Sequence, residues 1–421
     1  MKNWIWLLLG ILACAISWTY MHRVLLPWEY HVNVERGRLI AQMGDLYPRW
    51  VGTRELLLHG RNPYGPEVSR EIQIGFYGHP IEQSYDKPAT EIIDEQRFAY
   101  PVYVVFFLAP TVKADFEELQ QSAPIIFAGL LACSVVLWLA VVRWRPPLVV
   151  SGAMILIVLS TPQIAQGLRL RQFGFVVIFL LGMGAWGIVR GQLFWAGVLF
   201  AIATIKPQMI VLCLVWFAIW TLGEWKKRWP LAAGFSMALA LLAGSGELLV
   251  PGWLRYFLEG LAAYRKYFPT TSPIRLILGN WFGGAISVAV LVALLSYAWA
   301  KRTVEAHSPE FVDLLALFCI ASTLILPLLT PYNQALLLLP IVVLMRDWNR
   351  LPRFGRMAFV ALLAWPGVVS VLLLFHPPDV DSLRRTPLLP SVLVLLIPFV
   401  VCWLYFARGE SSAQVVPRVA R

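Results

Sequence analysis

The sequence predicts an all-α polytopic membrane protein, and three observations support this fold class. Of its 421 residues, 59% are hydrophobic and only 14% are charged, whereas soluble chains carry about 25% charged residues. The 19 tryptophans are typical of a protein that meets the lipid–water boundary. Apolar runs of helical length recur along the chain, which favours helices over a β-barrel. This composition excludes a soluble enzyme, a disordered chain and a disulfide-rich secreted scaffold.

The apolar runs define the expected elements. Residues 4–26 are predicted to be an uncleaved anchor, and a signal peptide ending near Cys14 is the alternative. The long polar segment that follows, residues 27–97, contains Arg49 to His59, which we expect to form a helix along the membrane surface. Several later runs are shorter than the roughly 20 residues of a straight span, and such broken spans tend to line cavities. All the later apolar runs, short and long, lie near 98–112, 124–142, 148–161, 172–189, 192–205, 207–222, 229–250, 282–300, 311–330, 332–345, 357–375 and 388–407.

The charge pattern predicts the topology. Residues 27–123 carry nine basic and fourteen acidic residues, a net charge of −5. The rest of the chain carries a net charge of +16, and the two parts together give the total of +11. Basic clusters between apolar runs indicate cytoplasmic loops, so the positive charge is assigned to topology and not to nucleic-acid binding. A consistent orientation requires residues 98–112 to be a re-entrant or surface helix. We therefore expect about 12 transmembrane helices in one integral membrane domain, residues 1–421, with residues 27–123 as a large first extracytoplasmic loop.

The leading candidate for catalysis is Asp45, which lies about twenty residues after the first apolar run. A carboxylate beside a membrane cavity can serve as a general base when an acceptor hydroxyl lies within about 3 Å. The alternative is an ordinary helix N-cap, a position that aspartate favours.

Candidate binding residues interrupt the later apolar runs on the predicted outer side. Lys206, which precedes Pro207, suits a phosphate, although a lysine that snorkels to the surface is equally compatible with its position. Arg169 and Arg171 can hold phosphate oxygens or contact lipid headgroups. The amides of Asn333 and Gln334 can hold sugar hydroxyls or simply mark a turn. The histidine and cysteine spacing does not suggest a metal site, and no cofactor is expected.

The order of several short motifs resembles that of glycosyltransferase family 87, membrane enzymes of the GT-C class that use polyprenyl-phosphate sugars. The motifs cover roughly residues 1–345 and differ from the usual family pattern at Gly174, where an asparagine is common, and after Tyr332, where a histidine is common. The matching segments are Asp45-Leu46-Tyr47, Gly60-Arg61-Asn62-Pro63-Tyr64, Tyr100-Pro101, Arg171-Gln172-Phe173-Gly174, Lys206-Pro207 and Thr330-Pro331-Tyr332.

The resemblance implies a hexosyltransferase of the cell envelope, with mannose the best-known sugar of the family. It implies inverting transfer from a polyprenyl-phosphate donor to a glycan, lipid or protein hydroxyl at the extracytoplasmic face of the cell membrane. Asp45 would be the catalytic base, and the substrate-binding residues would be Lys206, Arg169, Arg171, Gln172, Tyr64, Asn333 and Gln334. No metal is implied, because side chains can neutralise a leaving monophosphate.

Three other classes remain open at this level. A transporter or flippase would place charges near the midplane of several helices and alternate between two halves, whereas the polar residues here gather on one predicted side. A lipid-linked oligosaccharide polymerase or ligase differs mainly in using a diphosphate donor. A structural membrane protein without catalytic activity is the third.

Overall fold

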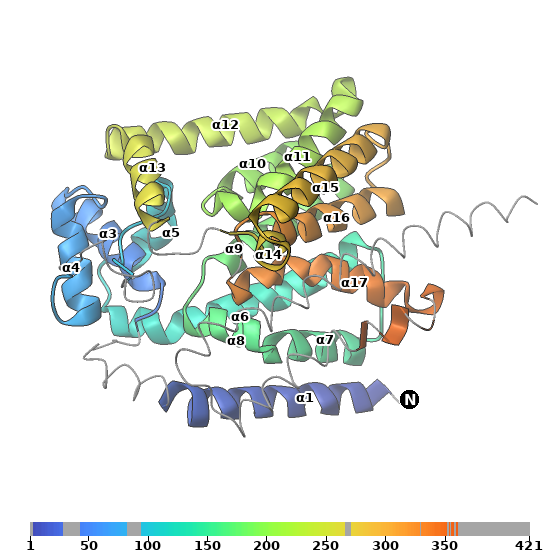
Figure 1. Ribbon diagram of the computed structural model, residues 1–421, viewed down its shortest axis with the longest axis horizontal. Coiled ribbons are helices and arrows are strands. Elements are labelled where there is room, and N and C mark those ends of the chain that lie inside the picture. The colour runs from blue at the N-terminus through green and yellow to red at the C-terminus, as the bar shows by residue number, and fades with distance from the viewer. Residues whose placement is uncertain are drawn as a thin grey trace, which may run out of the picture.

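The computed structural model describes residues 3–27, 43–81, 94–265, 271–328 and 330–360, the last range without residues 352, 354 and 358. Within these ranges all regular elements are helices (Figure 1). Their bounds are α1 Asn3–Tyr20, η1 Met21–Leu25, α3 Leu46–His59, α4 Pro66–Tyr77, η2 Val102–Val104, α5 Val105–Leu108, η3 Ala109–Thr111, α6 Phe116–Val141, α7 Leu148–Ser160, α8 Pro162–Arg169, α9 Gly174–Val189, α10 Leu193–Ala203, α11 Pro207–Gly223, α12 Trp225–Leu249, α13 Trp253–Tyr264, α14 Pro273–Leu278, α15 Asn280–Ala300, α16 Pro309–Ile325, η4 Pro331–Leu337, α17 Leu338–Arg346 and η5 Trp348–Arg350.

Four helices in the described ranges are long and apolar enough to cross a membrane. These candidate spans are Trp4–Arg23, Phe116–Val141, Trp225–Leu249 and Asn280–Ala300. Helix α7 and residues Gln163–Arg169, bent by 67°, make a fifth if they count as one span. The all-helical prediction is therefore confirmed for the described residues, whereas the count of about 12 is not.

The shortfall has a physical reason in the chain breaks. Helices α9, α10 and α11 have 16, 11 and 17 residues, so each is shorter than a straight crossing of about 20 residues. The predicted run at 388–407, and the predicted run at 357–375 from residue 361 onward, lie outside the described residues.

Residues 98–112 contain one short helical stretch. Pro101 precedes it, and η2, α5 and η3, which contains Pro110, follow one another directly and together span the ten residues Val102–Thr111, too few for a straight crossing. The Tyr103 hydroxyl shares a hydrogen bond of 2.8 Å with the Thr204 hydroxyl, and the Tyr103 ring meets Trp253 edge-on. The run is thus packed between the end of α10 and the start of α13, and its core valines are buried.

A group of basic residues marks one end of the helix bundle. Helices α9 and α11 are followed by Arg190 and by the Lys226–Arg228 cluster, about 25 Å from their first residues at 1.5 Å per residue. At that basic end, Arg346 Nη1 donates to the Val142 carbonyl at 3.3 Å. Figure 1 shows α3, α4 and α13 gathered at the other end, on the left.

Helices α10 and α12 cross in close contact because two glycines face the opposing backbone. A Cβ at Gly197 would lie 2.1 Å from the Leu231 carbonyl oxygen, and a Cβ at Gly234 would lie 2.0 Å from the Phe194 carbonyl oxygen. Real Cβ atoms do not approach backbone oxygen so closely, so the helices must separate to admit a methyl group.

Replacing Gly234 with alanine should therefore lower the free energy of unfolding by about 2 kcal/mol, the usual range for overpacking a tight contact. Denaturant unfolding in detergent measures it. Gly244, in the same helix, has open space at its Cβ position, and its alanine variant should be as stable as the wild type or slightly more stable. Equal loss in both variants would contradict this packing argument.

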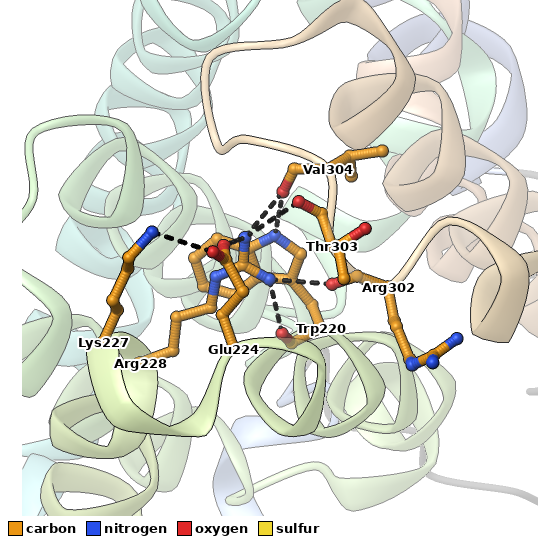
Figure 2. A network of polar contacts seen from close by, with 7 residues as sticks. All are labelled: Trp220, Glu224, Lys227, Arg228, Arg302, Thr303 and Val304. Atoms are coloured by element: carbon orange, nitrogen blue, oxygen red, sulfur yellow. Dashed lines mark hydrogen bonds and ion pairs between the residues drawn. The ribbon is translucent and has the colours of Figure 1, made fainter.

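The basic end of the bundle is organised by one buried arginine (Figure 2). Arg228, 4% exposed, donates to the carbonyls of Trp220 at 2.6 Å, Arg302 at 2.7 Å and Val304 at 2.8 Å. Its guanidinium also lies 3.8 Å over the Trp220 ring and pairs with Glu224. This one side chain joins the end of α11 and the start of α12 to the turn after α15.

Candidate functional site

Asp45 stands at the N-cap position of α3 but does not cap the helix. Its side chain makes no hydrogen bond to the first turn. Helix capping therefore does not account for a carboxylate at this position. Gly44 adopts φ +61°, and a Cβ there would lie 2.9 Å from the Leu170 carbonyl oxygen. The Asp45 backbone N–H donates to that same oxygen at 2.9 Å. Asp45 is thereby fixed against the segment between α8 and α9.

A chain of side-chain hydrogen bonds leads from Asp45 to two further segments. Gln172 donates from Nε2 to Asp45 Oδ2, and Lys206 Nζ donates to Gln172 Oε1 at 3.1 Å. Lys206 Nζ also donates to Asn333 Oδ1 at 3.1 Å. These four residues, Asp45, Gln172, Lys206 and Asn333, are here called the Asp45 cluster.

Each member of the cluster lies where a helix begins or has been interrupted. Gln172 lies in the turn before α9, Lys206 is the N-cap of α11 before Pro207, and Asn333 follows Pro331 in η4. At Pro207 and Pro331, proline cannot continue a preceding helical turn, so the chain starts a new helix there. The same breaks that shorten the spans therefore bring the polar side chains of distant segments to one place.

Lys206 is 6% exposed and forms no ion pair with a carboxylate within the described ranges. Its ammonium contacts two amide oxygens and lies 4.9 Å over the Tyr332 ring. Burial lowers the pKa of Lys206 to about 7, while the negative charge of Asp45 opposes that shift and Arg49 adds to it. A buried cation held by neutral oxygens is suited to receive an anion.

Arg49 is a site residue that the sequence reasoning did not select. Its Nη1 donates to the Asp45 carbonyl, and its guanidinium lies 4.6 Å over the Tyr100 ring. Tyr64, which was predicted to bind substrate, donates instead to the Tyr100 carbonyl at 2.6 Å and stacks on Tyr256. Tyr64 thus holds the backbone of Tyr100 in place through this hydrogen bond. The only signal for Arg49 in the sequence is its spacing of four residues from Asp45 on one helix.

Asp94 is a second carboxylate near the cluster that sequence reasoning missed. Its Oδ1 accepts from the Gln96 backbone N–H at 3.0 Å. Burial raises the pKa of Asp94 to about 6; the Gln96 N–H opposes this rise and the charge of Asp45 adds to it. No motif in the sequence distinguishes Asp94 from the other acidic residues of the first loop.

The remaining predicted residues are placed differently. Arg171 adopts φ +54° and directs its guanidinium to backbone oxygens, with Nε donating to Gln120 at 3.0 Å and Nη1 to Arg169 at 2.8 Å. Arg169 ends α8 and is half-buried, and Gln334 is half-buried beside Asn333. Neither arginine is a member of the chain of hydrogen bonds that runs from Asp45 through Gln172 and Lys206 to Asn333. Among the predicted residues, Asp45, Gln172, Lys206 and Asn333 are those that side-chain hydrogen bonds join into one chain.

These features define a class of protein: an all-helical membrane protein with a carboxylate, amides and a buried cation gathered at one end of its helices. The sequence of residues 98–331 matches the profile of glycosyltransferase family 87, and the chain belongs to this family. The protein is thus a membrane glycosyltransferase. Comparison with curated proteins gave no match. Gln172 and Lys206 lie inside the matched region, whereas Asp45 precedes it and Asn333 lies two residues beyond it.

Proposed function

We propose that the protein transfers a hexose from a polyprenyl-phosphate donor to an acceptor hydroxyl, with inversion at the anomeric carbon. Asp45 is the general base and Lys206 holds the donor phosphate. Gln172 and Asn333 orient these two groups and the sugar. Mannose is the first sugar to test, and the acceptor is a glycan, lipid or protein hydroxyl.

In the proposed step, the acceptor oxygen attacks the anomeric carbon while its proton passes to an Asp45 carboxylate oxygen. The bond between the anomeric carbon and the phosphate oxygen breaks, and its electron pair leaves with polyprenyl phosphate. The departing oxygen gains negative charge, which a nearby ammonium stabilises more strongly in the transition state than in the ground state. Attack on one face and departure from the other inverts the anomeric centre.

One observation carries the proposal: a single amide, Gln172, bridges the Asp45 carboxylate and the Lys206 ammonium. A base and a cation separated by one side chain can act on opposite sides of one sugar ring. If Lys206 holds the donor phosphate, this also explains why its ammonium has no carboxylate bonded to it within the described ranges.

We place the site on the extracytoplasmic side of a multi-pass cell-membrane protein. The support is the separation of charge: Arg190, the Lys226–Arg228 cluster and Arg346 lie at the helix ends opposite the Asp45 cluster. Basic ends favour the cytoplasm, so the cluster faces outward. A donor with a lipid tail then reaches the site from within the bilayer.

The proposal is tested with purified protein, a polyprenyl-phosphate hexose and candidate acceptors. Release of polyprenyl phosphate that depends on acceptor, with an inverted linkage in the product, is the expected result. Activity only with a polyprenyl-diphosphate oligosaccharide would instead indicate a polymerase or ligase.

The pH dependence of transfer should report Lys206. Because burial lowers the pKa of Lys206 to about 7, the cation is present below pH 7 and is lost as the pH rises through it. The value of kcat/KM for the donor, which reflects the free enzyme, should therefore fall above pH 7 by up to about tenfold per pH unit. An arginine stays charged throughout this range, so Lys206→Arg should flatten the decline.

Lys206→Met serves as the control for this series. It should bind the donor weakly at every pH, with a thermal unfolding midpoint close to that of the wild type. A decline above pH 7 that is the same in the wild type and in Lys206→Arg would exclude Lys206 as the titrating group.

A further inference from the structure

A groove on the surface of the bundle lies beside α14, α15 and the end of α16. It encloses about 290 Å³ and is lined by Ser272, Arg275, Gly284 and apolar side chains that include Val288, Leu291 and Ile325. None of these residues belongs to the Asp45 cluster. The groove is therefore a separate feature from the site proposed for transfer.

Two polar side chains of the groove, Ser272 and Arg275, lack partners within the described ranges, whereas the Ser287 hydroxyl, which also lines it, donates to the Gly283 carbonyl at 2.7 Å. Ser272 is 4% exposed, and its hydroxyl oxygen is buried without a hydrogen bond. Arg275 makes no hydrogen bond or ion pair with any described residue, and its guanidinium lies over Gly284, where a Cβ would be 3.3 Å from Nη2. A buried hydroxyl without a partner costs free energy. A cation and a hydroxyl donor that open to one cavity are suited to an anion with oxygen acceptors.

The surface around the groove is apolar and exposed. Helix α15 is a candidate membrane span, and its first residues include Trp281, 93% exposed, and Phe282. Val288, which lines the groove, is also exposed. Leu276, Ile277 and Leu278 of α14 continue this apolar surface. Arg275 thus lies next to an apolar surface that acyl chains can cover, on a helix whose neighbour α15 has a tryptophan in its first turn, a residue typical of the membrane interface.

We propose that this groove binds the phosphate of an anionic bilayer phospholipid. Arg275 and the Ser272 hydroxyl contact the phosphate oxygens, and one acyl chain follows Val288 and Leu291 along α15. A lipid is favoured over a free anion because apolar side chains, Val288, Leu291, Ile325 and Pro327, line the groove beside the polar groups. An anionic head is favoured over a zwitterionic one because Arg275 has no carboxylate partner among the described residues.

Native mass spectrometry of the full chain in detergent tests the proposal by titration with phosphatidylglycerol. One saturable lipid adduct is expected, with phosphatidylcholine bound more weakly. Arg275→Gln should weaken phosphatidylglycerol binding by about tenfold, as expected for loss of one charge-assisted contact. Gly284→Leu should weaken it similarly by filling the groove while all charges remain. Arg255→Gln is the matched control, because Arg255 is an exposed arginine paired with Glu259.

Two outcomes would overturn the proposal. In the first, the wild type, Arg275→Gln and Gly284→Leu bind phosphatidylglycerol equally, or inorganic phosphate displaces the lipid fully. In the second, polyprenyl phosphate, and not phosphatidylglycerol, loses affinity in both variants, which would assign the groove to the donor. The readout is binding and not transfer, so it stands or fails independently of the proposed reaction.

Discussion

Replacing Asp45 with asparagine should reduce kcat by about 10³-fold, within the 10²- to 10⁴-fold range of general base catalysis. The asparagine has the same shape, and its amide oxygen still accepts the hydrogen bond from Gln172. The site should therefore keep its geometry and lose only the group that takes the proton. The measurement is acceptor-dependent release of polyprenyl phosphate, together with the thermal unfolding midpoint in detergent.

Glu67→Gln is the matched control for this variant. Glu67 is an exposed carboxylate in the first turn of α4, and its amide variant should transfer sugar at the wild-type rate. Undiminished kcat in a folded Asp45→Asn enzyme would remove Asp45 from the mechanism. Asp94, the other carboxylate near the cluster, would then be the next candidate base.

Replacing Arg228 with alanine should lower the free energy of unfolding by about 3 kcal/mol. The change leaves Glu224 without its buried partner and removes the Arg228 donor from the carbonyls of Trp220 and Arg302, whereas the Val304 carbonyl keeps the hydrogen bond from Trp220 Nε1. Breaking a buried pair costs about 3–5 kcal/mol, and the partial exposure of Glu224 places this case at the lower limit. Denaturant unfolding in detergent measures the loss.

Lys227 provides an internal control, because it pairs with the same glutamate from the solvent side (Figure 2). Its side chain is 79% exposed, and exposed ion pairs contribute about 0–1 kcal/mol. Lys227→Ala should consequently unfold almost as the wild type does. If the two alanine variants lose equal stability, the carbonyl contacts of Arg228 are not what stabilises this end of the bundle.

Much of the fold could be predicted from hydrophobic patterning. The runs at 148–161, 207–222 and 282–300 correspond closely to α7, α11 and α15, because an apolar segment in lipid must satisfy its backbone within a helix. Patterning was less accurate where polar residues continue a helix. Helix α6 begins at Phe116, inside the predicted loop, because Asp115 and two glutamates favour a helix start as well as a loop.

The candidate site was predictable only in part. Gln172, Lys206 and Asn333 stand out because each interrupts or borders an apolar run, whereas Asp45 stands out as a carboxylate of the first loop that matches a family motif; the structure brings these four together. Arg171 stands out for the same reason but turns away, because its positive φ directs the side chain to the Gln120 carbonyl. Arg49 was not selected because an arginine on a half-polar helix is common. Its contact with the Tyr100 ring, which distinguishes it, is visible only in the structure.

By itself, the sequence determined that the chain is a helical membrane protein, where its helices break, and which side of those breaks is basic. These are local properties, since hydrophobicity, proline and charge act within a few residues. Only the tertiary structure decided that breaks separated by up to 288 residues, at Asp45 and Asn333, meet through Gln172 and Lys206. The reason is that packing of helices sets the distance between their ends, and no local pattern encodes that distance.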